Sequence, residues 1–419
     1  MIKAIKGTRD ILPPESKLWS QVEAAAREIF DLYGFSEIRT PLFESTELFA
    51  RGVGEDTDIV SKEMYTFEDR DDQSLTLRPE GTAPVVRAAI EHQLHQESPI
   101  LKLFYLGPLF RRERPQKGRS RQFHQIGAEV LGSDNPAIEA EILEMLDLFL
   151  KKIGIQDYEL LVNSIGCSKC RPAYLEVLSR AIQEKAASLC PDCQRRMQTN
   201  PLRVLDCKVP ACQPIIDKLP SIAEFLDEEC RAHFQKFLFY LGGREIPFKI
   251  VPRLVRGLDY YTRTTFEITS QALGAQNTLI GGGRYDGLAE AIGGPPTQGF
   301  GFALGLERIM LVLQQAGQMQ QEFVPELFLA PLGEVAFERA TLLVRFFRLQ
   351  DIRCTLDFEA RSLKSLMRLA NKQGARFVLI LGEDELKRGR YPLKRMSDGF
   401  QQEMTEDEIA LFVKSERHR

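Results

Sequence analysis

The stretch from Phe110 to Glu129, FRRERPQKGRSRQFHQIGAE, decides the fold of the region around it. It follows an apolar run, Leu101 to Phe110, and it leads into alternating side chains from Arg121 to Val130. Both patterns are typical of β-strands. The segment between them, residues 114–120, is polar and contains a proline and a glycine, which predicts a loop. The sequence therefore predicts a β-hairpin with a long basic tip.

One face of this hairpin has the composition of a binding surface. Successive strand side chains point to opposite faces. On the second strand, one face carries four residues: Phe123, Gln125, Gly127 and Glu129. A ring, an amide, a gap and a carboxylate suit a small polar ligand, and Arg111 and Glu113 can join them from the first strand. From Arg111 to Arg121 there are six basic residues and one acid, which attracts phosphates. A charged hairpin in solvent is the alternative.

Length and composition limit the class of protein. A chain of 419 residues predicts two or three domains, and 43% hydrophobic with 27% charged residues is typical of a soluble globular protein. The net charge of −4 gives no overall attraction to nucleic acid, so RNA contacts would need local basic patches. No apolar run approaches the roughly 20 residues that cross a bilayer, and residues 1–10 are too charged for a signal peptide. Eight cysteines in a chain without an export signal suggest reduced thiols. We therefore expect a cytoplasmic protein without membrane contact.

A second candidate binding segment lies between a short strand and a helix that begins near Ala83. Gly81 lets the backbone approach a ligand closely. Glu80 and Thr82 place a carboxylate and a hydroxyl beside it, and a carboxylate there can hold an ammonium group. A helix N-terminus capped by Thr82 is the alternative.

The segment from Leu254 to Tyr261, LVRGLDYY, offers a charged fork and two rings. The guanidinium of Arg256 suits a phosphate, and Tyr260 and Tyr261 supply rigid rings with hydroxyl tips. An arginine salt bridge beside core tyrosines is the alternative.

Two glycine-rich segments follow. Residues 281–287, GGGRYDG, lack the lysine of phosphate-cradling loops, so we interpret them as backbone that lies close to a substrate. Residues 299–305 alternate small with large apolar side chains, which predicts a strand whose bare face leaves room for a flat ligand. Arg308 comes next, near the start of a helix, where anions bind well.

Taken together, these segments resemble a known family. Phe-Arg-x-Glu, a basic loop and Arg-x-Phe resemble motif 2 of the class II aminoacyl-tRNA synthetases, and LVRGLDYY resembles a signature of histidyl-tRNA synthetases. An amphipathic helix expected over residues 15–33 and an extended segment over residues 35–44, in which Pro41 marks an edge or a kink, resemble motif 1, which builds the dimer interface. Residues 299–308 resemble motif 3. The resemblance covers nearly the whole chain. It implies a bacterial-type histidine–tRNA ligase that uses ATP with Mg²⁺, L-histidine and tRNA-His, and that forms a homodimer.

The resemblance also implies a fold class and a domain plan. The fold class is α/β, with an α+β catalytic domain on an antiparallel class II sheet and a small α/β anticodon-binding domain. The expected catalytic core comprises residues 1–166 and 244–320, interrupted by an insertion at 167–243, and the anticodon-binding domain comprises residues 326–419. From residue 326 onward, strands alternate with helices, which by itself predicts a mainly parallel α/β domain. One of its helices has a basic face, which could equally be solvated: Arg361, Lys364, Arg368 and Lys372.

Site roles follow from the resemblance residue by residue. Catalytic roles around the triphosphate fall to three arginines: Arg111, Arg256 and Arg308. Two more residues contact ATP at its adenine: Glu113 and Phe123. Histidine is bound by seven residues: Glu80, Gly81, Thr82, Gln125, Glu129, Tyr260 and Tyr261. The 5′ end of the tRNA meets the hairpin tip at two residues: Arg114 and Gln116.

Cysteines in residues 167–243 predict a metal site. Cys167-x-x-Cys170 is followed after 19 residues by Cys190-x-x-Cys193, and four thiolates can close a tetrahedral shell around zinc. We therefore expect a structural Zn²⁺ at these four cysteines. Cys207 and Cys212 lie downstream, so which four of the six would bind stays open. Unligated, reduced thiols are the alternative.

Two other functions compete with ligation. A non-catalytic paralogue that regulates histidine biosynthesis would share the core, but such proteins lack the LVRGLDYY-type signature and the anticodon domain. An RNA-binding sensor would use the same fold without ligation. Incubation with ATP, histidine and tRNA separates the three functions.

Overall fold

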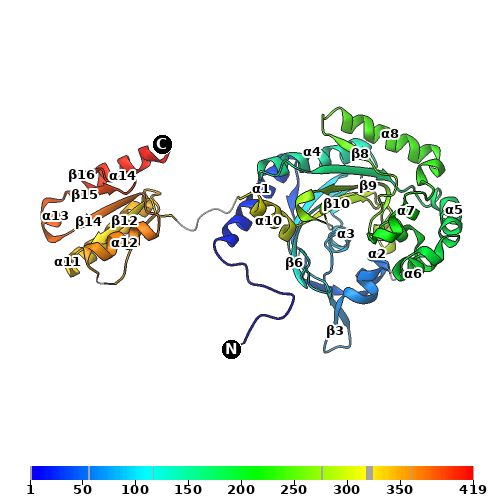
Figure 1. Cartoon of the computed structure of the whole chain (residues 1–419), viewed down its shortest axis with the longest axis horizontal. Helices are drawn as coiled ribbons and strands as arrows, with labels where there is room; N and C mark the ends of the chain where they lie inside the picture. Colours follow the sequence, from blue (N-terminus) through cyan, green and yellow to red (C-terminus); the bar gives the residue numbers. More distant parts are fainter. Residues whose placement is uncertain are drawn as a thin grey trace. The chain divides into compact units, whose positions relative to one another are not determined.

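The computed structural model describes residues 2–54, 57–116, 118–274, 277–317, 324–359 and 361–418. They form two compact units, Met1–Met319 and Gln320–Arg419 (Figure 1). The expected end of the catalytic core, residue 320, lies outside the described residues. Within those ranges, every helix is too short or too polar to span a bilayer.

The larger unit is built on an eight-stranded sheet with the order β1–β5–β6–β11–β10–β9–β7–β8. Its strands are β1 (Ser36–Glu37), β5 (Leu101–Phe110), β6 (Gln122–Leu131), β7 (Glu159–Ser164), β8 (Phe248–Ile250), β9 (Thr262–Thr269), β10 (Thr278–Arg284) and β11 (Gly299–Gly305). All neighbours are antiparallel except the two outer pairs, β1 with β5 and β7 with β8. This antiparallel centre confirms the expected fold class.

The predicted hairpin is formed by β5 and β6. They pair without interruption from Leu101 opposite Leu131 to Phe110 opposite Gln122, which leaves residues 111–121 as the connecting loop. One face of β6 turns Ile126, Ala128 and Val130 into the main core, as the alternation predicts. The other face is left for the site.

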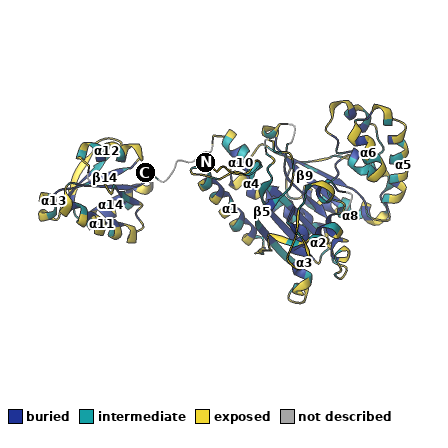
Figure 2. Ribbon diagram, turned by 90° about the horizontal axis from the view of Figure 1, so that it is seen from below, coloured by how far each residue is buried: buried dark blue, intermediate teal, exposed yellow. Residues whose placement is uncertain are grey.

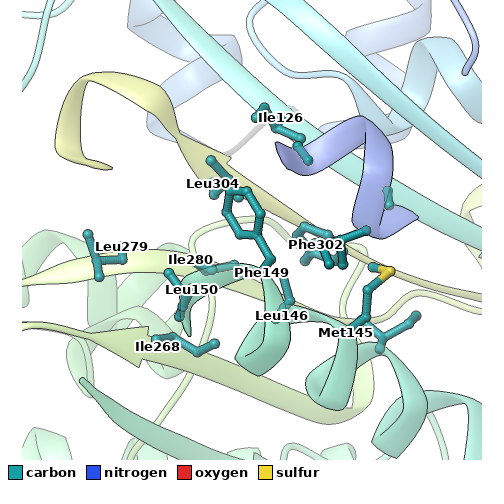
Figure 3. Close-up of a cluster of buried hydrophobic side chains, with 14 of the residues drawn as sticks. Ile126, Met145, Leu146, Phe149, Leu150, Ile268, Leu279, Ile280, Phe302 and Leu304 are labelled. Carbon is teal, nitrogen blue, oxygen red and sulfur yellow. The ribbon is translucent and has the colours of Figure 1, made fainter. Parts of the chain in front are cut away.

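Four helices complete the core on the face of the sheet that carries Ile126, Ala128 and Val130: α1 (Glu15–Leu32), α4 (Pro136–Lys152), α8 (Glu228–Gly242) and α10 (Leu306–Gln315). Figure 3 shows Phe149 and Leu150 of α4 among Ile280, Phe302 and Leu304 of β10 and β11. Because the core fixes β6, β10 and β11 from behind, their opposite faces form a firm platform.

The strand expected at residues 35–44 is divided into two. β1 pairs with β5, whereas β2 (Phe43–Ser45) belongs to a separate three-stranded sheet with β4 (Ser74–Leu77) and β3 (Tyr65–Glu68). Pro41 stands at the break, where it removes a ladder donor. Helix α2 (Thr46–Val53) packs beside β2 and β4, and α3 (Thr82–Glu91) and the short α9 (Leu288–Ala291) pack against α2 and each other.

The expected insertion is mostly helical. It contains α5 (Arg171–Gln183), α6 (Pro191–Thr199), the 3-10 helix η4 (Pro201–Val204) and α7 (Gln213–Ile216), around a hydrophobic cluster of its own. Figure 2 shows α5 and α6 exposed along their outer faces. Helix α8, at the end of the insertion, instead gives Phe237 and Leu241 to the main core.

The smaller unit has a five-stranded sheet in the order β13–β12–β14–β15–β16. Its elements are β12 (Leu327–Pro331), α11 (Glu334–Leu349), β13 (Cys354–Leu356), α12 (Leu363–Lys372), β14 (Phe377–Leu381), α13 (Glu383–Arg388), β15 (Tyr391–Arg395), β16 (Gln401–Met404) and α14 (Glu406–Ser415). β13, β12 and β14 are parallel as predicted, but β15 and β16 are antiparallel, so the sheet is mixed. Three of the four basic residues predicted on one helix face, at 364, 368 and 372, lie on α12, whereas Arg361 precedes the helix; all four are exposed.

Candidate active site

A cavity of about 400 Å³ opens over the platform face of the large sheet. Eleven of the expected site residues line it: Glu80, Gly81, Thr82, Arg111, Glu113, Phe123, Gln125, Arg256, Tyr260, Tyr261 and Arg308. They come from the hairpin, the start of α3, the loop before β9 and the start of α10. The cavity therefore joins segments that are separated by more than 200 positions in the chain.

At the hairpin, a cation and an aromatic ring face each other. The Cζ atom of Arg111 lies 5.3 Å from the centroid of the Phe123 ring, and its Nε donates a 2.8 Å hydrogen bond to the Pro79 carbonyl oxygen. Glu113 is paired with Arg119 at 2.9 Å. An aromatic ring of this kind can stack on a flat base, and the guanidinium over the ring supplies positive charge beside it.

Arg256 is held in place from two sides. Its guanidinium is ion-paired with Glu267 of β9, and its Cζ lies 5.8 Å from the centroid of the Tyr261 ring. A Cβ added at Gly281 would lie 2.2 Å from Arg256 Nη2, so this glycine makes room for the arginine. The side chain is therefore fixed before any phosphate arrives.

The glycines of β10 and β11 make room for protein side chains, whereas we expected them to leave room for a ligand. Gly299 makes room for Tyr285, and Gly301 for Glu129, whose Oε2 would lie 1.8 Å from an added Cβ. The bare face of β11 is occupied there by protein side chains instead of a flat ligand, and only its end, at Ala303 and Gly305, lines the cavity.

Arg308 lies in the first turn of α10, and its Nη1 donates a 2.6 Å hydrogen bond to the Thr278 carbonyl oxygen. Burial lowers its pKa, and the positive charges of Arg119 and Arg111 act in the same direction. An anion bound among these three arginines would relieve their mutual repulsion.

At the other end of the cavity, Glu80 caps α3. Its Oε2 accepts from the Thr82 backbone N–H at 2.8 Å and its Oε1 from the Ala83 N–H at 2.9 Å. The alternative interpretation of this segment was a helix N-terminus capped by Thr82. The segment does cap the helix, but the capping side chain is Glu80. Burial raises the pKa of Glu80. The Thr82 hydroxyl is then free to donate to Glu129, at 2.7 Å.

Glu129 is not among the residues that line the cavity. It is fully buried and accepts hydrogen bonds from the hydroxyls of Thr82 and Tyr285. Burial raises the pKa of Glu129 to about 8, although both hydrogen bonds oppose this shift. Direct contact with a ligand, as expected from the sequence, stays a prediction.

Two tyrosines were missed. Tyr105 lines the cavity between Gly81 and Gly127; a Cβ added at either glycine would lie within 2.3 Å of its ring or hydroxyl. Among the described residues, its buried hydroxyl has no hydrogen-bond partner. Tyr285 holds Glu129. Tyr105 pairs directly with Gly127 across the hairpin, so the two residues point to the same face of the sheet. Pairing the two strands residue by residue from the loop would therefore have placed Tyr105 on the binding face.

The insertion also reaches the cavity. Arg196 of α6 and Arg203 of η4 both line it, and each pairs with Asp58 at 3.4 to 3.5 Å. Arg203 also donates to the carbonyl oxygen of Gly257, next to Arg256. These arginines come from a segment without motif likeness, so nothing in the sequence pointed to them.

The expected tRNA contacts, Arg114 and Gln116, lie outside the cavity. Both are exposed on the loop between β5 and β6, where the Gln116 backbone N–H donates to the Arg119 carbonyl oxygen at 3.1 Å. This hydrogen bond brings the backbone of Gln116 next to that of Arg119.

The cysteines form two groups, which corrects the expected single site. Cys167 and Cys170 join Asp227 and Cys230, a set called here the Asp227 cluster; Cys190 and Cys193 join Cys207 and Cys212, called the Cys190 cluster. Within each group, one possible ligand atom of every residue lies within 4.8 Å of the others. Helix α5 carries the chain away after Cys170, so the two Cys-x-x-Cys pairs do not meet.

Comparisons with known proteins agree with this geometry. The family model for histidyl-tRNA synthetase matches residues 7–309, and the anticodon binding domain matches residues 326–416. The chain is 55% identical over 414 residues to a histidine–tRNA ligase of Solibacter usitatus, covering 98% of each protein. It is 52% identical to that of Syntrophotalea carbinolica, over 96% of this chain and 95% of the relative.

A solved structure agrees as well. The crystal structure of apo histidyl-tRNA synthetase from S. aureus superposes with a TM-score of 0.81 at 38% identity, covering 99% of this chain and 100% of that one. These matches confirm the resemblance found in the sequence. The chain belongs to the histidyl-tRNA synthetase family, whose members are aminoacyl-tRNA ligases.

Proposed function

We propose that this cavity carries out both steps of the histidine–tRNA ligase reaction. In the first step, a carboxylate oxygen of histidine attacks the α-phosphorus of ATP, and the bond to pyrophosphate breaks. In the second, a terminal ribose hydroxyl of tRNA-His attacks the histidyl carbonyl carbon, and AMP leaves. One observation carries the proposal: the ring of Phe123, the three arginines and the residues around Glu80 line a single cavity.

The ATP end of the cavity is positive where phosphate charge develops. In the proposal, Phe123 stacks on adenine and Glu113 accepts a hydrogen bond from its amino group. Arg111 and Arg256 bracket the α-phosphate, and Arg308 binds the γ-phosphate. Because hydrogen bonds and an ion pair already orient these arginines, they stabilise the transition state with little reorganisation.

At the histidine end, Glu80 and the Thr82 hydroxyl face the α-ammonium group, and Gln125 holds the polar end of the amino acid. Gly81, between Glu80 and Thr82, lines the cavity and leaves room for the Tyr105 ring. Tyr260 and Tyr261 enclose the imidazole. Glu129 does not line the cavity, and it orients the Thr82 hydroxyl by accepting a hydrogen bond from it. It also offers an acceptor to an imidazole N–H that reaches it. Such an acceptor rejects side chains that cannot donate.

Mg²⁺ accompanies ATP in this proposal. Glu267 accepts a 2.9 Å hydrogen bond from the Thr278 hydroxyl, and Arg308 donates to the carbonyl oxygen of the same threonine, so a hard oxygen donor lies beside the proposed γ-phosphate position. When bound, the ion would neutralise the charge of the β- and γ-phosphates. Glu267 is the residue that would hold it.

We also propose a structural Zn²⁺ at the Cys190 cluster. The Sγ atoms of Cys190 and Cys207 are 3.8 Å apart. Four thiolates at about 2.3 Å from zinc in tetrahedral geometry stand about 3.8 Å from one another. The Cys190 backbone N–H also donates to Cys212 Sγ at 3.3 Å, which favours a thiolate.

The smaller unit is proposed to bind the anticodon arm of tRNA-His through the exposed basic residues of α12 and Arg361. Phosphate contacts of this kind weaken as salt rises. Charging of tRNA for translation fits the cytoplasmic location that we expect from the reduced thiols.

The test is histidine-dependent exchange of pyrophosphate into ATP, followed by charging of tRNA-His. A ligase gives both activities. A regulatory paralogue gives no exchange, and an RNA-binding sensor retains tRNA without charging it. Absence of exchange in folded protein would remove the ligase assignment.

The hairpin tip should matter only for the second step. Replacing Arg114 by alanine should raise the KM for tRNA-His about 3- to 10-fold, since one phosphate contact is lost. Pyrophosphate exchange should be unchanged, because Arg114 is exposed and does not line the cavity. Arg51→Ala, another exposed arginine, is the control. Equal tRNA kinetics in both variants would contradict the proposed contact.

We further propose that the motif 1 region forms a homodimer. Phe43 and Phe67 are 53% and 45% exposed on the three-stranded sheet, with ring centroids 6.5 Å apart. Such apolar pairs on a surface mark contact sites. Phe43→Asp should therefore weaken dimerisation by about 10- to 100-fold, measured by sedimentation equilibrium. Leu411→Asp, at an equally apolar exposed position of the smaller unit, should leave the dimer intact.

A further inference from the structure

The Asp227 cluster lies at the place where the insertion leaves and rejoins the catalytic core. Cys167 and Cys170 follow β7 directly, and Asp227 and Cys230 stand at the start of α8. We propose that these four residues bind a second Zn²⁺, distinct from the one at the Cys190 cluster, which fastens the first residues of the insertion to its last helix.

The spacing of the ligand atoms fits an ion among them. Cys167 Sγ lies 3.6 Å from Cys170 Sγ and 3.4 Å from Asp227 Oδ2. With Zn–S of about 2.3 Å and Zn–O of about 2.0 Å, tetrahedral geometry requires about 3.8 Å between sulfurs and about 3.5 Å between sulfur and oxygen. A disulfide would need about 2.0 Å between the sulfurs. The observed distances match a shared ion and do not match a Cys167–Cys170 bond.

Asp227 is prepared for a ligand role. Its Oδ1 accepts the Cys230 backbone N–H at 2.8 Å and thereby caps α8, so its Oδ2 is the oxygen turned toward the thiols. As a neutral thiol, Cys167 can donate a hydrogen bond to this oxygen. Once the cysteines ionise, only a cation among them offsets the repulsion between the thiolates and the carboxylate, so Oδ2 is placed to be a ligand.

Two backbone donors support the thiolate form of the cysteines. The Lys169 N–H donates to Cys167 Sγ at 3.4 Å, and the Asp227 N–H donates to Cys170 Sγ at 3.3 Å. Hydrogen bonds to ligating sulfurs are the usual outer shell of thiolate metal sites. Three sulfurs and one oxygen are a donor set that suits zinc.

The position of the cluster gives the ion a structural task. Cys167 and Cys230 are separated by more than 60 residues, and a cross-link between them removes much of the freedom of the unfolded insertion. Arg171 follows Cys170 and donates to the backbone carbonyl oxygens of Ile165 and Tyr261. The ion would therefore also fix the backbone behind the Tyr261 ring.

Metal analysis tests the proposal independently of ligase activity. Protein purified without added zinc should contain two equivalents per chain. Cys230→Ser should lose one equivalent, Cys212→Ser the other, and the double variant both. Cys354→Ser, which removes a buried cysteine outside both clusters, is the matched control and should keep two. A Cys230→Ser protein with the zinc content of the wild type would overturn the proposal.

Asp227→Asn provides a second test, and this variant is expected to fold because asparagine keeps the helix cap. Asparagine caps helices as well as aspartate does, so α8 keeps its cap while the cluster loses its anionic ligand. One zinc equivalent should then be released to a colorimetric chelator at least about 10-fold faster than from the wild type, since a ligand has been weakened. Release of both equivalents at the wild-type rate would exclude Asp227 as a ligand and with it this site.

Discussion

Arg256→Ala should lower the rate of histidine-dependent pyrophosphate exchange by about 100- to 1,000-fold, the usual cost of one transition-state donor. Histidine affinity should change by less than about 3-fold, because the proposed histidine contacts are made by other residues. The loss also leaves Glu267 without its cation, which adds negative charge beside the phosphates. The measurement is exchange kinetics over a range of histidine concentrations, with direct binding of histidine by calorimetry.

Arg253→Ala is the matched control for this prediction. Arg253 stands three residues earlier, is exposed and pairs with Asp217 instead of lining the cavity. Its variant should exchange pyrophosphate at the wild-type rate. An unchanged turnover in Arg256→Ala would instead show that this guanidinium does not meet the α-phosphate.

Glu129→Gln should change how stability depends on pH. Burial raises the pKa of Glu129 from 4.5 to about 8, so between these values the native state holds a proton that the unfolded state has released. The free energy of unfolding therefore falls with rising pH by about 1.4 kcal/mol per unit over this window, and the loss is complete above the folded pKa. Glutamine does not titrate, so urea unfolding at pH 5 and pH 8 should show a smaller decline in the variant.

An exposed glutamate serves as the control. Glu47→Gln lies on the surface of α2 and should follow the wild-type pH profile. If Glu129→Gln loses stability between pH 5 and pH 8 as steeply as the wild type does, Glu129 is not held protonated in the native protein.

The same Glu129→Gln variant should bind histidine more weakly. Glutamine resembles the protonated form of Glu129, but it cannot become a carboxylate when an imidazole N–H approaches, and its amide nitrogen cannot accept from Thr82 or Tyr285. The KM for histidine should rise about 10-fold, with a smaller change in the KM for ATP. A histidine KM equal to that of the wild type would show that the pocket lies elsewhere.

The hairpin could be predicted from the sequence because its information is local. Alternation of side chains specifies two strands and their faces, and Pro115 with Gly118 specifies the loop, so Phe123 and Gln125 were assigned to the ligand side without knowledge of the rest. The break near Pro41 was visible only as an edge or a kink, because the sheet that takes up β2 is formed by residues further along the chain.

What the sequence did not reveal depends on contacts between distant segments. Tyr105 lies within an apolar run, where a tyrosine is typical of a core, and its place in the cavity follows from the two glycines beside it. The cysteines were grouped by their spacing, yet Asp227 and Cys230 reach Cys167 only because α8 returns to the end of β7. An aspartate that caps a helix gives no sequence signal of a metal ligand.

Arg196 and Arg203 stand in the wall of the cavity although the chain places them in the insertion. This has a consequence for any attempt to trim the protein to a minimal catalytic fragment. Deleting residues 167–243 would open the cavity on one side, leave Asp58 without the two guanidinium groups that pair with it, and remove Phe237 and Leu241 of α8 from the main core. A shortened protein would therefore have to keep α8 and carry replacement charges on that wall of the cavity.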